Sequence, residues 1–169
     1  LESDKQVLKR NPGEHYRFIS EVCKSLKPKL SIEIGTHRGM GTLSLEKYSK
    51  KVVTFDVVNW HEFKGSLLRK EDFSKIEQRT LDLSIDSNWQ SNFDLFHEAD
   101  LIFVDGPKDG RFEKLMIPRI LQTMKSGSCM IIDDIRFLNM IPIWKGIELP
   151  KFDATSFGHF SGTGVVQIP

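Results

Sequence analysis

The sequence predicts an α/β fold with a doubly wound, mainly parallel sheet, helices on both faces and an antiparallel C-terminal strand. Three observations favour this fold. Short apolar segments alternate with amphipathic ones, the connections between them are mostly short, and the apolar segments are nearly continuous rather than alternating. Continuous runs rich in β-branched residues are typical of strands buried on both faces of a parallel sheet.

The first half of the chain contains strand and helix patterns in turn. Tyr16, Ile19, Cys23 and Leu26 lie three and four residues apart, which is one face of an amphipathic helix. The expected helices are 14–26, 40–48, 61–73 and 87–98, and the expected strands are 30–34, 52–58 and 76–81. Asp86 or Ser87 is expected to cap the last of these helices.

The second half repeats the alternation. Strands are expected at 101–104 and 130–132, helices at 112–124 and 137–147, and two closing strands at 152–157 and 165–168. Pro118 lies inside the helical stripe 112–124 and predicts a kink or a late start of that helix, because proline supplies no backbone N–H.

Length and composition predict one domain spanning 1–169, with 1–12 as a flexible N-terminal segment. A chain of 169 residues buries enough surface to fold without disulfides, so Cys23 and Cys129 are expected to be buried thiols in a reducing compartment. Basic residues number 24 and acidic residues 23, which argues against nucleic acid as a partner. No apolar run approaches the roughly 18 residues of a membrane span. We therefore expect a cytoplasmic protein without a membrane partner.

A glycine-containing turn follows the strand at 30–34. A dinucleotide fingerprint counted from Gly35 would need glycine where the chain has His37 and Met40, and a P-loop would need a Gly-Lys-Ser/Thr triplet that is absent here. Asp56 follows Gly35 by 21 residues and ends the next strand. A carboxylate at that place can accept hydrogen bonds from both ribose hydroxyls of a nucleoside.

The pattern Glu-x-Gly-x-x-x-Gly, formed by Glu33, Gly35 and Gly39, resembles the first motif of class I S-adenosylmethionine (SAM)-dependent methyltransferases. His37 replaces the usual middle glycine. The resemblance implies the Rossmann-like class I methyltransferase fold, with SAM as the cofactor. The cofactor-binding residues that it implies are Glu33, Gly35, Thr36, His37, Gly39, Asp56, Asp82 and Asp105.

A narrower resemblance rests on Asp105, on Lys108 three residues later, and on the pair Asp133 and Asp134 after the next apolar segment. This pattern is similar to that of the metal-dependent O-methyltransferases of the catechol O-methyltransferase type, including the bacterial branch with macrolide sugar O-methyltransferases. It implies that Asp105, Asp133 and Asp134 bind Mg²⁺ or Mn²⁺, and that Lys108 and Asp105 are catalytic, with Lys108 as the general base. A divalent cation lowers the pKa of a hydroxyl and so prepares it to attack the methyl group.

Several alternatives stay open at this point. The Asp-Gly pair at 105–106 is also a common turn, and Asp133 and Asp134 could cap the following helix. Metal-independent O- or N-methyl transfer and a noncatalytic nucleoside-binding module are the rival functions. The acceptor is expected to be a small molecule, with His159 and His15 as candidate substrate residues. A chain this short has little sequence for a substrate lid, which leaves open a homodimer that shares the acceptor.

Overall fold

The computed structural model describes residues 13–169, so the segment 1–12 lies outside the described residues. Its centre is a seven-stranded sheet in the order β3-β2-β1-β4-β5-β7-β6. Strands β1 to β5 are parallel, and β7 runs antiparallel to both of its neighbours. The strands are β1 Leu30–Ile34, β2 Lys51–Asp56, β3 Ile76–Thr80, β4 Leu101–Val104, β5 Cys129–Asp133, β6 Lys151–Asp153 and β7 Thr163–Gln167.

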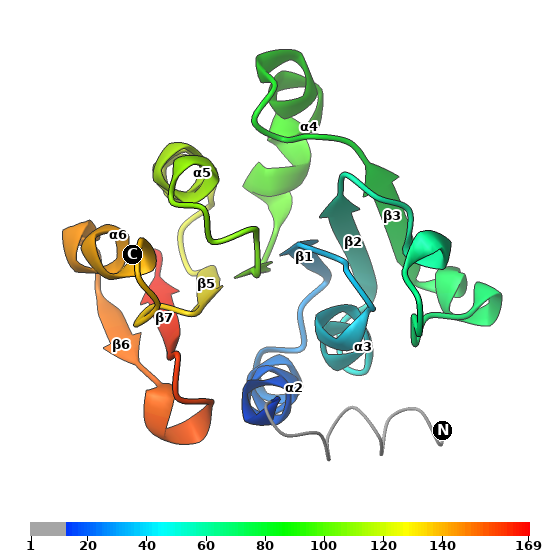
Figure 1. Ribbon diagram of the computed structural model, residues 1–169, viewed down its shortest axis with the longest axis horizontal. Helices are drawn as coiled ribbons and strands as arrows, with labels where there is room; N and C mark the ends of the chain where they lie inside the picture. The colour runs from blue at the N-terminus through cyan, green and yellow to red at the C-terminus, as the bar shows by residue number, and fades with distance from the viewer. Residues whose placement is uncertain (1–12) are drawn as a thin grey trace.

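Helices cover both faces of the sheet (Figure 1). The α-helices are α2 Glu14–Leu26, α3 Met40–Glu46, α4 Asp86–Glu98, α5 Arg111–Thr123 and α6 Met140–Gly146. Helices α2 and α3 pack on one face and α4, α5 and α6 on the other, so the chain has two apolar core layers. Strand β4 shows why both layers form: Leu101 and Phe103 enter the α2–α3 layer, while Ile102 and Val104 enter the opposite layer.

This architecture confirms the predicted fold class. The chain places β2 and β3 on one side of β1 and then β4 and β5 on its other side, so the order of the strands reverses direction between β1 and β4. Ligands of doubly wound sheets bind outside the carboxyl ends of the strands at such a switch point. The ends of β1, β2, β4 and β5 are therefore the place to look for a site.

The segment 61–73 is not the predicted helix. It contains two short 3₁₀ turns, Trp60–Glu62 and Lys70–Ser74. Gly65 between them has a φ of +75°, a left-handed conformation that ends a right-handed helix. The loop is also fixed by tertiary contacts, because the Leu67 N–H donates to the Arg38 carbonyl at 2.9 Å.

Several element boundaries differ from the sequence prediction. Helix α4 begins at Asp86 after Ile85 and has no side-chain cap, so neither Asp86 nor Ser87 is the cap. Helix α5 begins at Arg111 and contains Pro118, so the late start is wrong. The side chain of Asp109 stabilises this early start, since its Oδ1 accepts from the N–H groups of Arg111 and Phe112. The expected 137–147 helix is shortened to α6, and the 152–157 strand becomes β6 followed by a 3₁₀ turn, Thr155–Phe157.

Both cysteines are free; Cys23 is buried as expected, whereas Cys129 is only half-buried. Within residues 13–169, no helix combines the length and the apolar character that crossing a bilayer requires.

Candidate active site

The glycine turn after β1 brings the ends of β1 and β4 into contact. Gly35 has a φ of +101°, and a Cβ atom at this position would lie 2.0 Å from the carbonyl oxygen of Asp105. Only glycine fits so close an approach. The turn therefore holds the end of β1 directly beside the end of β4, where Asp105 begins the following loop.

Asp56 at the end of β2 is held by the same turn. Its Oδ2 accepts from the N–H of His37 at 2.9 Å, and its Oδ1 accepts from the N–H of Val58 at 3.1 Å. His37 itself has a φ of +43° and an exposed side chain, whose ring meets Phe63 edge-on at 5.1 Å between centroids. Each carboxylate oxygen of Asp56 keeps a lone pair for a ligand hydroxyl.

A cavity of about 790 Å³, which we name the strand-end cavity, opens at these strand ends. It adjoins the carboxyl ends of β1, β2 and β4, and its size suits a nucleoside-sized ligand. Five of the sequence-predicted cofactor residues line it: Gly35, His37, Asp56, Asp82 and Asp105. Its apolar wall includes Phe63, Phe112 and Leu115.

Three other predicted cofactor residues do not line this cavity. Glu33 is fully buried beneath the turn, where its Oε2 accepts from the hydroxyls of Thr42 and of Thr54, the latter at 2.6 Å. Burial raises the pKa of Glu33 to about 8, although both hydroxyls oppose the increase. The Thr36 hydroxyl pairs with that of Thr54 at 2.7 Å. Gly39 faces the side chain of Leu68. Glu33, Thr36 and Gly39 therefore contact residues that pack against the turn rather than the cavity.

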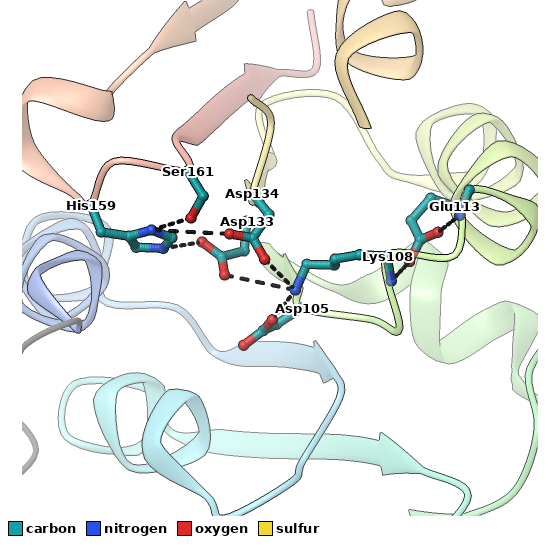
Figure 2. A network of polar contacts seen from close by, with 8 residues as sticks. Asp105, Lys108, Glu113, Asp133, Asp134, His159 and Ser161 are labelled. Carbon is teal, nitrogen blue, oxygen red and sulfur yellow. Dashed lines mark hydrogen bonds and ion pairs between the residues drawn. The ribbon is translucent and has the colours of Figure 1, made fainter. Parts of the chain in front are cut away.

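Asp105, Asp133 and Asp134 come together at the ends of β4 and β5 (Figure 2). Each offers a carboxylate oxygen within 4.8 Å of the others. The ammonium of Lys108 lies among them, with Nζ paired to Asp105, 3.1 Å from Asp134 Oδ2 and 3.7 Å from Asp133 Oδ2. We name these three aspartates and Lys108 the acidic cluster.

Electrostatics hold Lys108 in its charged form. Burial lowers the pKa of this ammonium, but the charges of Asp105 and Asp133 outweigh burial, and the pKa lies above its usual range. Lys108 as the structure shows it is therefore protonated at neutral pH. Lys108 could act as a base only if another cation bound its carboxylate partners, because they are what raises its pKa.

Glu113 fixes the loop that presents Lys108, and the sequence reasoning missed it. Its side chain is fully buried, and its Oε1 and Oε2 accept from the N–H groups of Lys108 at 2.8 Å and Gly110 at 3.0 Å. The capping arrangement at the start of α5 was a signal that could have found it, since Gly110 is followed three residues later by glutamate. The left-handed φ of Lys108, +58°, is thus supported by a buried carboxylate.

On the other side of the cluster, His159 binds Asp133 (Figure 2). Its Nε2 lies 2.8 Å from Asp133 Oδ1, and its Nδ1 lies 2.6 Å from the hydroxyl of Ser161. Burial opposes charge on this imidazole, but the bond to Asp133 outweighs burial and raises the pKa of His159. His15 packs against His159 with 4.2 Å between ring centroids. The two histidines predicted near the substrate are therefore neighbours, and they adjoin the acidic cluster rather than the strand-end cavity.

Comparisons with solved structures match this fold over nearly the whole chain. An O-methyltransferase from Bacillus cereus in complex with S-adenosylhomocysteine (SAH) is 17% identical, with a TM-score of 0.72 over 100% of this chain and 91% of that one. An SAH-bound methyltransferase from Podospora anserina is 15% identical, with a TM-score of 0.66 over 99% and 86%. The O-methyltransferase TomG from Streptomyces achromogenes, in complex with SAM, is 13% identical, with a TM-score of 0.62 over 92% and 80%. The sequence matches no curated protein.

The strand order with an antiparallel β7, together with these likenesses, defines the fold of class I SAM-dependent methyltransferases. A family model described as a methyltransferase domain matches residues 32–135, which is more than half of the chain. The chain belongs to this methyltransferase family, as its glycine turn and strand-end aspartates predicted.

Proposed function

We propose that the protein transfers a methyl group from SAM to a hydroxyl oxygen of a small-molecule acceptor, with help from a divalent cation. The observation that carries the proposal is the position of the acidic cluster beside the strand-end cavity. Asp105 belongs to both, because it lines the cavity and also contributes a carboxylate to the cluster. A cofactor in the cavity would therefore present its methyl group close to groups that can activate a hydroxyl.

The strand-end cavity has the chemistry to hold SAM. Asp56 would accept hydrogen bonds from the ribose hydroxyls, since its carboxylate lines the cavity at the end of β2. Asp82 lines the same cavity at the end of β3, where its Oδ1 is oriented by the N–H and hydroxyl of Ser84. Phe63 and Phe112 provide apolar walls for a purine ring.

The acidic cluster fits a hard cation such as Mg²⁺ or Mn²⁺. Three converging carboxylates are the donors that such ions prefer, and the ammonium of Lys108 among them shows that positive charge is favoured there. Asp105, Asp133 and Asp134 would hold the ion, which would lower the pKa of an acceptor hydroxyl. Lys108, held in place by Glu113, would then be the nearest group to take the hydroxyl proton.

Metal-independent O-methyl transfer is the second candidate, and one observation favours it. Lys108 contacts all three carboxylates, so the cluster already has a cation in place. In that case the ammonium would orient the acceptor oxygen rather than accept its proton.

The deciding experiment follows methyl transfer from labelled SAM to a panel of catechols and sugar hydroxyls, with either Mg²⁺ or excess chelator. SAM binding is measured by calorimetry under both conditions. We expect transfer to be lost with chelator while SAM affinity is kept, because the cavity and the cluster share only Asp105. Full transfer in chelator would select the metal-independent route, and the absence of SAM binding under both conditions would refute the proposal as a whole.

A further inference from the structure

A second group of possible metal ligands lies beside the acidic cluster and is of a different chemical kind. His15, His159 and Asp133 each place one ligand atom within 4.8 Å of the other two. All three side chains are buried, with exposed fractions of 5%, 9% and 4%. They come from three distant parts of the chain: the start of α2, the end of β5, and the loop before β7.

His15 is the unexplained member of this group. Neither of its ring nitrogens has a hydrogen-bond partner among residues 13–169, although both are buried. A buried polar group without a partner is destabilising by roughly 1–3 kcal/mol, so native proteins rarely keep one without a reason. A neutral imidazole has a free lone pair, which is the form that binds metal ions.

His159 offers the second imidazole, and a metal bound at its Nε2 would replace the proton that this nitrogen shares with Asp133. The Ser161 hydroxyl at 2.6 Å from Nδ1 fixes the ring, and Nε2 points at Asp133 Oδ1. Metal-binding histidines almost always have such an outer partner on the second ring nitrogen, because it sets the tautomer and the ring orientation.

We propose that His15, His159 and Asp133 form a binding site for a borderline divalent metal ion, of the class of Zn²⁺, Co²⁺ and Fe²⁺. Two imidazoles and one carboxylate are the ligands that this class prefers, whereas a set of carboxylates alone suits Mg²⁺. Ligand atoms of one tetrahedral zinc ion lie roughly 3.3 Å apart, given metal–ligand distances of about 2.0–2.1 Å. The separations here, from 2.8 Å to within 4.8 Å, bracket that value.

This site is distinct from the acidic cluster, although the two share Asp133. In Figure 2, Asp133 lies between His159 and Lys108, so its two oxygens face different neighbours. Oδ1 faces His159, and Oδ2 faces Lys108. The inference does not depend on SAM or on methyl transfer, since it uses neither the strand-end cavity nor Asp105.

The test uses Co²⁺ as a spectroscopic probe and Zn²⁺ as its competitor, with the whole chain freed of metal by a chelator that is then removed. We expect one Co²⁺ per chain, with visible absorption that Zn²⁺ abolishes and with a metal-dependent rise in the melting temperature. His15→Phe and His159→Gln should each weaken Co²⁺ binding at least about 100-fold, the upper end of what the loss of an outer-shell partner costs. Asp105→Asn, which leaves His15, His159 and Asp133 in place, should keep the Co²⁺ spectrum. His61→Ala, which removes an exposed histidine far along the chain, is the matched control and should also keep it.

Folding is checked separately, by circular dichroism of each metal-free variant. His15→Phe removes two unpartnered nitrogens, so we expect this variant to fold without metal. If the phenyl ring of His15→Phe does not fit, His159→Gln tests the site instead. No stoichiometric Co²⁺ in the wild-type protein would overturn the inference. Unchanged binding in both folded histidine variants would also overturn it, as would loss of binding in His61→Ala. Methyl transfer that continues at full rate in excess chelator would refute only the metal role of the acidic cluster. The site of His15, His159 and Asp133 is tested separately, by the Co²⁺ spectrum.

Discussion

Replacing Glu33 by Gln should remove a large part of the pH dependence of stability. Glu33 is fully buried, and burial raises the pKa of its carboxyl group from 4.5 to about 8. The folded protein therefore keeps this proton up to about pH 8, while the unfolded chain releases it near pH 4.5. Because the folded state binds more protons between these values, the free energy of unfolding falls as the pH rises through this window. At about 1.4 kcal/mol per pH unit, the difference corresponds to a loss of about 5 kcal/mol.

Glutamine mimics the protonated carboxyl group, and its Oε1 can accept from the same two threonine hydroxyls. The assay is urea unfolding between pH 5 and pH 8.5 of the wild-type protein, Glu33→Gln and the control Glu98→Gln, which alters an exposed carboxylate at the end of α4. We expect Glu33→Gln to lose less stability than the wild-type protein over this range, and the control to follow the wild type. Equal pH slopes for the wild type and Glu33→Gln would refute the reasoning.

Three further substitutions test how the site is built. Asp56→Ala should weaken SAH binding at least about fivefold in calorimetry, since an acceptor of two hydrogen bonds contributes roughly 1–3 kcal/mol; an unchanged Kd would contradict its ribose role. Glu113→Ala leaves two loop N–H groups without their acceptor, and should lower the free energy of unfolding in urea by about 3 kcal/mol and lower kcat. Gly35→Ala places a Cβ 2.0 Å from the Asp105 carbonyl oxygen, and should lower the melting temperature strongly. Gly146→Ala, where no atom lies within 4 Å, should not.

The fold was predictable because its signals are local. Helix α2 and strands β1 and β4 have the bounds that the sequence predicts, since each is a single periodic or continuous apolar segment closed by a turn. The conformation of the segment 61–73 could not be predicted, because it depends on contacts with the turn between β1 and α3. Leu68 is buried against Gly39, and Leu67 is bonded to Arg38, which no pattern within the segment indicates.

The site divides in the same way. Asp105, Asp133 and Asp134 could be predicted because they follow neighbouring parallel strands, whose carboxyl ends meet at one edge of the sheet. The contact between His15 and His159 could not, since it joins the first described helix to a loop near the end of the chain. Nothing in the spacing of two such distant residues predicts that they meet.

Lys108 decides how the acidic cluster can act. Its pKa is the result of two opposing effects: burial lowers it, and the carboxylates raise it by a larger amount. When another cation replaces Lys108 at Asp105, Asp133 or Asp134, the carboxylates raise the pKa of Lys108 less, while burial still lowers it. The pKa of Lys108 must then fall, which makes it easier for the ammonium to lose a proton. The same residue is thus a fixed counter-ion without a bound cation and a candidate base with one. A pH–rate profile that moves to lower pH when Mg²⁺ is added would be the signature of this exchange.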